Sequence, residues 1–252
     1  MLSKNQAKFI NSLKQKKFRD EHGLFVAEGA KIVNEILNSG IKVREIYSSI
    51  NFQHSIFSHE IKVIRIKASE LKKMSSLSTP NEVLAVCEIP KGDFNIFSIG
   101  MKLSLVLDTV QDPGNLGTII RIADWFGVEN IICSEETVEV YNPKVIQATM
   151  GSITRVKVHY VNLLEFLKKY KEEFPELKIY GALLVGENIY GQKLSKEGLV
   201  VIGNESKGIS EELMPFITDK IKIPSYSVNE TSVESLNAAI AAAVICAEFR
   251  RN

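Results

Sequence analysis

Apolar residues recur at two different spacings along the chain, and these spacings predict strands and helices that follow one another. In the first third, strands are expected at 23–29, 43–49, 61–67 and 82–90, and helices at 4–19, 30–40 and 68–77. Further along, strands are expected at 103–110, 130–136, 153–161, 178–186 and 199–205, and helices at 118–128, 141–151, 163–174, 209–217 and 233–251. Strands that alternate with helices are typical of parallel sheets, so the sequence predicts an α/β protein.

Residues that favour helix ends mark some of these boundaries. Asn142 stands before a proline and Gly151 follows the periodic run, which is the arrangement expected around a helix. Ser210 is the expected N-cap of a later helix that has two acidic residues in its first turn. Thr231 and Glu234 have the spacing of a capping box before the last helix.

One stretch, 91–101, has little apolar pattern and contains two glycines, so we expect it to be a linker. It divides the chain into a small α/β domain at 1–90 and a second domain with a parallel sheet at 102–252. The total length of 252 residues is sufficient for two such domains.

The net charge of +1 says little about partners, but the distribution of charge says more. The first 19 residues contain no acidic residue and six basic ones, Lys4, Lys8, Lys14, Lys16, Lys17 and Arg19. A basic arm of this kind can contact the phosphates of a nucleic acid. The alternative is the solvated face of an amphipathic helix with Phe9, Ile10 and Leu13 facing inward, and both interpretations can hold together.

Neither the three cysteines nor the four histidines have the spacing of metal ligands, so no metal site is expected. Cys87 and Cys133 lie in strand-like runs and Cys246 in an apolar helix, which indicates buried thiols in a reducing compartment. The basic N-terminus lacks the apolar core of a secretory signal, and the run 236–247 is too short to span a bilayer. A cytoplasmic protein without membrane attachment is therefore expected.

Three segments of the second half each pass from a strand through a turn of small or polar residues into a helix, at 107–128, 198–210 and 221–251. Ligands of open α/β sheets bind beyond the carboxyl ends of the strands. The polar residues of the three turns could therefore gather around one crevice.

Asn115, Gly117 and Arg121 are the notable residues of the first segment. An arginine near the start of an otherwise apolar helix can bind a phosphate or polarise an oxygen atom. The alternative for Arg121 is a surface salt bridge with Asp124 or Asp108.

The second and third segments are ambiguous when each is taken alone. The turn from Gly203 to Gly208 has neither the residue order of a P-loop nor that of a dinucleotide-binding loop, so it could be a plain strand-to-helix turn. The third segment begins an alanine-rich helix at Ser235–Asn237. Its small side chains permit close approach to another layer or subunit, although a buried core helix would also explain them.

Taken in this order, the three segments resemble the motifs of the SpoU (TrmH-like) branch of the SPOUT superfamily of RNA methyltransferases. NLGTIIRIADWFGV is similar to the first motif of that family, VIGNESKGIS to the second, and IKIPS with ESLNAAIAAA to the third. Near the N-terminus, FVAEGAKIVNEIL resembles the small substrate-binding domain of many members, so the resemblance covers most of the chain. One departure is the segment YSVNETSVE, which is longer than usual and lacks glycine.

The resemblance implies a C-terminal parallel-sheet domain with a deep trefoil knot, preceded by a small α/β substrate-binding domain. It implies a homodimer through the C-terminal domain, with the active site at the interface. It also implies S-adenosylmethionine as methyl donor, with Gly203, Ile223 and Leu236 at the cofactor-binding positions. The implied reaction is methyl transfer to a ribose 2′-hydroxyl, which makes RNA the expected partner, ribosomal rather than transfer RNA by analogy alone.

Arg121 matches the arginine that the family needs for catalysis. Because arginine keeps its proton in proteins, we expect Arg121 to stabilise the developing alkoxide and the adjacent phosphate, with base action as the alternative. Asn115 and Glu205 are expected to orient Arg121 and the loops. Ser235 and Asn237 are expected to shape the pocket and to bind the substrate or a loop.

Functions of other classes remain as alternatives. A non-catalytic RNA-binding module could keep the basic arm but could lose polar motif residues, and this chain has Asn115, Arg121, Glu205 and Asn237. A nucleotide-dependent oxidoreductase would need a Gly-x-Gly-x-x-Gly turn after an early strand, which the sequence does not contain. A transfer RNA 2′-O-methyltransferase is the alternative within the same family.

Overall fold

A computed structural model describes residues 2–52, 61–92, 94–226 and 235–251. The chain forms two compact units, of which the first comprises Met1–Gly92 with Glu139–Thr154 and the second comprises Asp93–Val138 with Arg155–Asn252. The predicted division at 1–90, 91–101 and 102–252 stays a prediction. It did not anticipate that Glu139–Thr154 folds with the first unit.

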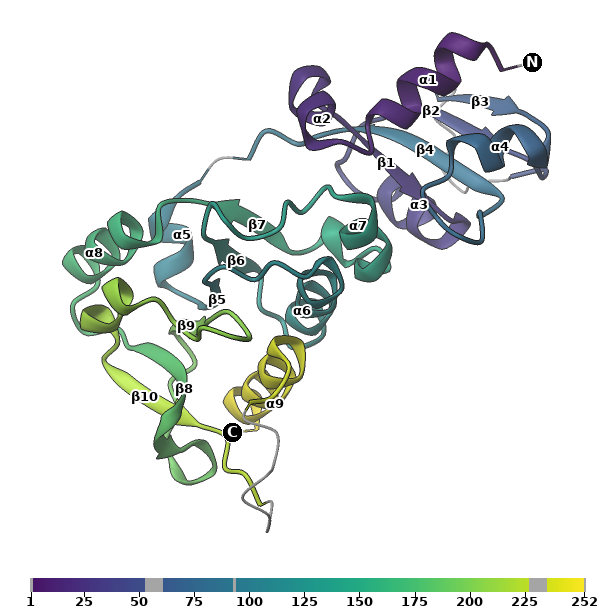
Figure 1. Cartoon of the computed structure of the whole chain (residues 1–252). Helices are drawn as coiled ribbons and strands as arrows, with labels where there is room; N and C mark the ends of the chain where they lie inside the picture. The colour runs from purple at the N-terminus through teal and green to yellow at the C-terminus, as the bar shows by residue number, and fades with distance from the viewer. Residues whose placement is uncertain (1, 53–60, 93, 227–234, 252) are drawn as a thin grey trace. The chain divides into compact units, whose positions relative to one another are not determined.

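The first unit is built on a four-stranded sheet (Figure 1). Its strands are β1 (Leu24–Glu28), β2 (Val43–Ser48), β3 (Lys62–Arg65) and β4 (Val83–Glu88). Its helices are α1 (Lys4–Ser12), α2 (Lys16–His22), α3 (Ala30–Leu37), α4 (Ala68–Met74), α7 (Pro143–Thr149) and the 3₁₀ turn η1 (Ser152–Thr154).

Strand order in this sheet is β1-β4-β2-β3, with β4 antiparallel to both of its neighbours and β2 parallel to β3. Alternate residues of β1 face opposite sides of the sheet. Leu24 and Val26 pack in a core with Ile10 of α1 and Leu71 of α4. Phe25 faces the other way and packs against the ring of Tyr141, just before α7. Both faces of the sheet are therefore covered.

A single helix was expected at 4–19, and that prediction was wrong. The chain forms α1 and α2, separated at Leu13–Gln15, and the carbonyl groups of Leu13 and Lys14 accept hydrogen bonds from the guanidinium of Arg19 at 2.9 Å. Ile10 and Leu13 face inward as expected, whereas Phe9 is 38% exposed. Arg19 is also buried, with only 2% of its surface exposed. Arg19 is thus a structural cation and not part of a solvent-facing basic arm.

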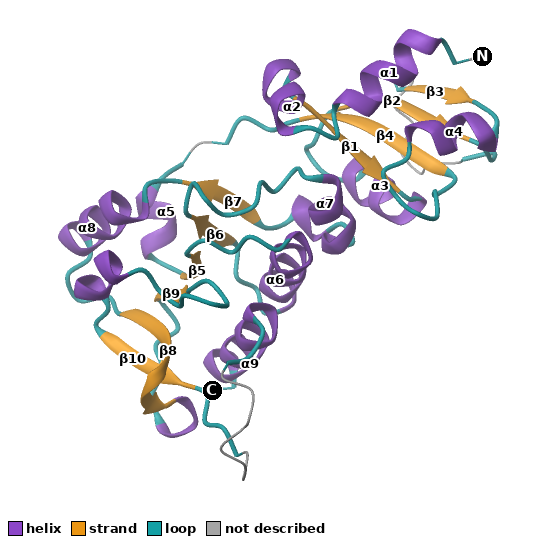
Figure 2. Ribbon diagram, in the orientation of Figure 1, coloured by secondary structure: helices purple, strands orange, loops and turns teal. Residues whose placement is uncertain are grey.

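The second unit contains a six-stranded sheet with helices on its faces (Figure 2). Its strands are β5 (Leu103–Leu107), β6 (Asn130–Cys133), β7 (Lys157–Tyr160), β8 (Ile179–Asn188), β9 (Gly198–Ile202) and β10 (Asp219–Lys222). Its helices are α5 (Ile96–Gly100), α6 (Pro113–Trp125), α8 (Leu163–Glu173) and α9 (Ala238–Arg250), with 3₁₀ turns η2 (Ile189–Gly191) and η3 (Glu211–Phe216).

All neighbouring strands of this sheet are parallel, in the order β10-β8-β9-β5-β6-β7. β5, β6 and β9 are buried along their whole length, which explains why apolar residues dominate them in the sequence. α5, α8 and η3 cover one face, while α6 and α9 pack against each other on the opposite side (Figure 2). The parallel α/β fold is thereby confirmed, while the trefoil knot stays a prediction.

Residues 91–101 were expected to be a linker, but α5 lies within them. Ile96 and Ile99 are 5% and 0% exposed and join the core of the second unit, with Asn95 as N-cap through its side chain to the Phe97 N–H at 2.9 Å. A helix of this length has too few residues to produce a recognisable apolar period.

Three helix boundaries also differ from expectation. α6 begins at Pro113, ahead of the expected start at 118, because Asp112 caps it and proline suits a first helical position. Ser210 precedes a 3₁₀ turn, and its side chain makes no capping hydrogen bond. The N-cap of α9 is Asn237. The expected capping box at Thr231 and Glu234 lies outside the described residues.

Cys87, Cys133 and Cys246 are buried and unpaired, as expected. Burial raises the pKa of all three thiols, that of Cys246 to about 12, so none is a nucleophile at neutral pH. Within the described part of the chain, no helix has the length and apolar character needed to cross a membrane.

Candidate active site

A cavity of about 550 Å³ lies in the second unit, beside the ends of β9 and β10 and the start of α9. Its lining includes Gly203, Ile223 and Leu236, the three residues that sequence analysis placed at cofactor-binding positions. Glu205 and Ser235 also line it. The volume is typical of a small-molecule site, and the position beyond the carboxyl ends of parallel strands is where the sequence predicted a crevice.

A chain of hydrogen bonds joins polar residues of all three motifs. Asn237 Nδ2 donates to Asn115 Oδ1 at 2.9 Å, and Asn115 Nδ2 donates to Glu205 Oε1 at 2.5 Å. Ser235 Oγ lies 3.5 Å from the carbonyl oxygen of Glu205. The Asn115 amide therefore accepts from the third motif and donates to the second, which determines its orientation and brings together four of the five predicted catalytic residues.

Helix caps hold the two asparagines in place. Asp112 Oδ1 accepts from the backbone N–H of Asn115 at 2.8 Å at the start of α6. At the start of α9, Asn237 Oδ1 accepts from the N–H groups of Ala239 and Ile240 at 3.0 and 3.3 Å. Side-chain oxygen atoms commonly satisfy the free N–H groups of a first helical turn in this way. Asn237 thus caps α9 with its oxygen and reaches Asn115 with its nitrogen.

The second motif forms a tight loop that depends on glycine. Asn204 and Gly208 exchange two backbone hydrogen bonds, of 3.0 and 2.8 Å, and Gly208 has a φ of +72°. A Cβ atom at Gly203 would lie 2.2–2.3 Å from backbone atoms of Gly208 and Ile209. Only glycine permits this approach of two backbone segments, and the loop forms one wall of the cavity.

Side chains connect this loop to the end of β5. Asn204 Nδ2 donates to the carbonyl oxygen of Thr109 at 2.9 Å, and Asp108 Oδ2 accepts from the backbone N–H of Ser210 at 2.7 Å. Thr109 has a φ of 59°, which is unusual for a residue with a branched side chain. The first and second motifs are therefore held together by their backbones as well as by Asn115 and its partners.

Arg121 is the predicted site residue that the structure leaves apart from the others. It lies in the middle of α6, is exposed, and does not line the cavity. The alternative salt bridges are not formed, because Asp124 binds Arg155 at 2.9 Å and Asp108 binds backbone. Among the described residues, the Arg121 side chain has no hydrogen-bond or ion-pair partner, so its charge is available.

One wall of the cavity was missed by sequence analysis. Gly181 of β8 pairs with Lys220 of β10, but the next pair joins Glu187 and Ile221, so residues 182–186 of β8 have no partner there and form a bulge. Ala182, Leu183, Leu184 and Val185 in this bulge line the cavity. The signal that could have indicated it is the pair of glycines inside a strand, at Gly181 and Gly186.

The groups that line the cavity suit an organic cofactor. Apolar side chains and the backbone of the glycine loop dominate the cavity walls, and charged side chains are few. Within the ranges that the structure describes, no group of three or more His, Cys, Asp or Glu side chains could hold a metal ion.

Family models match both parts of the chain. The SpoU rRNA Methylase family matches residues 102–247, and the MRM3-like substrate binding domain matches residues 4–85. A curated relative from Bacillus subtilis (strain 168), the 23S rRNA (guanosine(2553)-2′-O)-methyltransferase RlmP, is 30% identical over 251 residues, which cover 98% of this chain and 97% of the relative.

Solved structures with the same fold cover the whole chain. A protein from Porphyromonas gingivalis, described as an RNA methyltransferase of the TrmH family, superposes with a TM-score of 0.89 at 36% identity, covering 100% of this chain and 99% of that one. An AdoMet-bound rRNA methyltransferase from Sinorhizobium meliloti superposes with a TM-score of 0.84 at 27% identity, covering 100% and 96%.

Proposed function

Because the chain belongs to the SpoU rRNA methylase family, we propose that it transfers a methyl group from S-adenosylmethionine to a ribose 2′-hydroxyl of structured RNA. The observation that carries this proposal is the hydrogen-bonded set Asn237, Asn115 and Glu205 at the edge of the cavity. Ribosomal RNA is the proposed substrate class, since the relatives from Bacillus subtilis and Sinorhizobium meliloti are both named as rRNA methyltransferases.

The cavity fits the proposed cofactor. Gly203 leaves room where any side chain would collide with backbone, and Ile223 and Leu236 supply apolar walls. When bound, S-adenosylmethionine supplies a methyl group activated by a positively charged sulfonium. The protein then has to align the ribose hydroxyl with that methyl group and to accommodate the hydroxyl proton.

Residues of this chain can handle both the proton of the ribose hydroxyl and the negative charge that develops on its oxygen. Glu205 lines the cavity, and its Oε1 accepts from Asn115 at 2.5 Å, so its carboxylate is the proposed acceptor of the hydroxyl proton. Arg121 supplies an unpaired guanidinium that can stabilise a developing alkoxide and bind an adjacent phosphate. Ser235 and Asn237 hold the third motif against the second and first.

The protein should bind S-adenosylmethionine without a metal ion and methylate ribosomal RNA. Calorimetry should give the same affinity with and without excess chelator, because the cavity offers no metal-ligand cluster among its described residues. Mapping of 2′-O-methyl sites in total RNA, with and without the gene, identifies the target. A loss of methylation confined to transfer RNA would establish the alternative substrate, and no binding of the cofactor would refute the proposal.

We further propose a homodimer formed through the second unit. The side chains of Trp125, Ile240 and Leu236 on and beside α6 and α9 are 85%, 55% and 46% exposed, so large apolar side chains of this helix pair face solvent in the single chain. Arg121 lies off the cavity of its own chain. A site completed by a second copy would account for both features.

Light scattering at micromolar concentration should therefore give about twice the chain mass of 28.2 kDa. Trp125→Glu should shift the protein towards the monomer, because burial of a charge at an apolar interface is unfavourable. The matched control is Leu164→Glu, since Leu164 is 38% exposed on α8, away from α6 and α9. An active monomer would exclude the dimer.

The basic arm remains a proposed RNA contact, but two of its six basic residues are not available to RNA. Lys4, Lys8, Lys16 and Lys17 are exposed, whereas Lys14 donates to the Ser75 carbonyl at 2.8 Å and Arg19 is buried. Only the exposed lysines can exchange their counterions for RNA phosphates.

Reversal of charge at Lys8, Lys16 and Lys17 should lower RNA affinity and flatten its salt dependence. The slope of log affinity against log salt should become less steep by about 0.7 to 0.9 for each phosphate that the protein no longer neutralises. Reversal of Lys168, Lys169 and Lys171 on α8, also exposed, makes the same change of charge and serves as the control. If the slope of log affinity against log salt is the same in both triple variants, the arm does not contact RNA and is only a solvated helix face.

The trefoil knot and the cytoplasmic location complete the proposal. The knot is supported by the match to solved structures of the family, and the location by the buried, reduced cysteines.

A further inference from the structure

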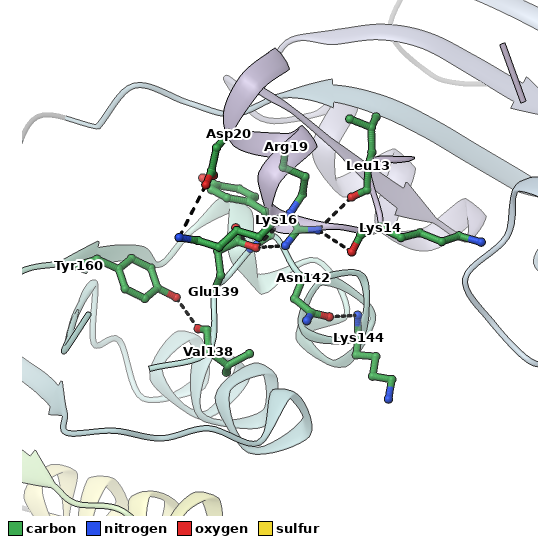
Figure 3. Close-up of polar contacts among 11 residues, drawn as sticks. Leu13, Lys14, Lys16, Arg19, Asp20, Val138, Glu139, Asn142, Lys144 and Tyr160 are labelled. Atoms are coloured by element: carbon green, nitrogen blue, oxygen red, sulfur yellow. Dashed lines mark hydrogen bonds and ion pairs between the residues drawn. The ribbon is translucent and has the colours of Figure 1, made fainter. Parts of the chain in front are cut away.

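Arg19 is the most deeply buried cation of the first unit. Its guanidinium donates to the carbonyl oxygens of Leu13 and Lys14 and, through Nε at 3.0 Å and through Nη2, to the carboxylate of Glu139 (Figure 3). The side chain of Glu139 is 16% exposed. These hydrogen bonds require the planar guanidinium of arginine, which has N–H donors in several directions. A lysine ammonium group could not make all of them.

Glu139 begins the segment that folds with the N-terminal residues although it lies far along the chain. Its second oxygen atom accepts from the backbone N–H of Tyr141 at 2.7 Å. The Tyr141 ring packs on Phe25 of β1 with 4.8 Å between ring centroids, and α7 lies against the same strand. The ion pair and this aromatic contact together anchor residues 139–154 to the first unit.

The residue before Glu139 belongs to the second unit and makes its hydrogen bonds there. The Val138 N–H donates to the carbonyl oxygen of Val110 at 3.0 Å, and the Val138 carbonyl accepts from Tyr160 Oη at 2.6 Å (Figure 3). In the same loop, Ser134 Oγ accepts from the N–H of Thr109 at 3.0 Å. Loop 134–138 therefore holds the end of β5, where the first motif begins.

These bonds continue to the cavity. The carbonyl oxygen of Thr109 accepts from Asn204 Nδ2 at 2.9 Å, and Asn204 belongs to the glycine loop of the second motif. Glu139 is anchored in the first unit by Arg19. The next residue towards the N-terminus, Val138, begins the series of hydrogen bonds that leads to the cavity wall in the second unit.

We propose that Arg19 and Glu139 are a positioning pair through which RNA held by the first unit controls methyl transfer in the second. This inference rests on the proposed function. Stability alone does not account for the pair, because apolar residues of similar size commonly stabilise a core as well as a buried ion pair does. Glu139 is anchored in the first unit and Val138 in the second, so the pair fixes the point at which the chain passes from one unit to the other.

The test compares the wild-type protein with Glu139→Gln, which keeps the size of the side chain and removes its charge. Arg19→Lys is a second variant that keeps the charge and loses the fork. Glu88→Gln is the matched control, since it makes the same change of side chain in the first unit and its partners Lys42 and Arg44, at 3.5 and 2.9 Å, are exposed. Circular dichroism confirms that each variant is folded.

Three quantities are measured with an in-vitro transcript of large-subunit ribosomal RNA as the probe. They are the RNA affinity, the single-turnover methylation rate at saturating RNA, and hydrogen exchange in loops 134–138 and 204–208 with and without RNA. In Glu139→Gln and Arg19→Lys the rate should fall roughly tenfold, within the range known for residues that couple two sites, while RNA affinity changes little. RNA should slow exchange in loop 204–208 of the wild type and of Glu88→Gln only.

A wild-type rate in both pair variants, or RNA-dependent protection of loop 204–208 that survives in them, would overturn the inference. A fall in RNA affinity as large as the fall in rate would make the pair a support of the RNA-binding unit alone, which also overturns it. Absence of methylation by the wild type on every RNA would refute the proposed function instead. The exchange measurements would then still decide whether the pair connects the two units.

Discussion

Arg121→Ala should lower the single-turnover rate of methyl transfer by at least two orders of magnitude, which corresponds to about 3 kcal/mol of transition-state stabilisation. Arg121 is exposed on α6 and has no polar partner among the described residues, so removal of its side chain breaks no polar interaction within the described chain. The affinity for S-adenosylmethionine should change little, because the cavity is lined by the second and third motifs. Single-turnover kinetics and cofactor titration of the same variant separate these two effects.

Two further variants make the Arg121 experiment specific. Arg121→Lys should recover only part of the rate, since a point charge does not reproduce the planar fork of guanidinium. Arg155→Ala is the control, because Arg155 is also a surface arginine and its partner is Asp124 of the same helix α6. Near-normal methylation by folded Arg121→Ala would remove Arg121 from the mechanism and leave Glu205 or a bound water molecule to accept the proton.

Gly203→Ala should weaken the binding of S-adenosylmethionine by about two orders of magnitude, or roughly 2.7 kcal/mol. The new Cβ atom would lie 2.2–2.3 Å from the C and O atoms of Gly208 and the N atom of Ile209. Those atoms are backbone and cannot rotate away, so the Asn204–Gly208 loop must move and the wall of the cavity moves with it. Calorimetric titration with the cofactor measures the decrease in affinity.

The control for this substitution is Gly191→Ala in η2, where an added Cβ atom would meet no atom within 4 Å. That variant should bind the cofactor as the wild type does. The RNA affinity of Gly203→Ala should be retained, since the first unit is unchanged, and circular dichroism should show that the whole variant is folded. Wild-type affinity of Gly203→Ala for the cofactor would mean that the glycine loop is not part of the cofactor site.

Much of the second unit could be predicted from the sequence because its strands are buried on both faces. β5, β6 and β9 appear as mainly apolar runs, Asn115 lies in the first turn of the helix that follows β5, and Glu205 lies in the turn that follows β9. The alternative predicted for Arg121, a salt bridge to Asp124 or Asp108, could be tested only with coordinates. Both carboxylates have other partners.

Local sequence patterns did not predict short elements and helix breaks that depend on contacts with distant residues. α5 is too short to show a period, and the break between α1 and α2 is held by the buried side chain of Arg19. The bulge in β8 required knowledge of its pairing with β10. In each case the deciding contact is made with residues that sequence spacing does not reveal.

The sequence by itself determined the class of fold and the family, and it indicated the turns that contain Gly203 and Glu205, since apolar period and motif order are properties of local chain segments. Only the tertiary structure decided which residues touch. Asn237 reaches Asn115 across 122 positions, and Arg19 reaches Glu139 across 120. A basic residue in a helical run has the same local pattern whether it faces solvent or a buried carboxylate. Its role is decided by the partner that folding brings to it, because burial of a charge is tolerated only when another group compensates it.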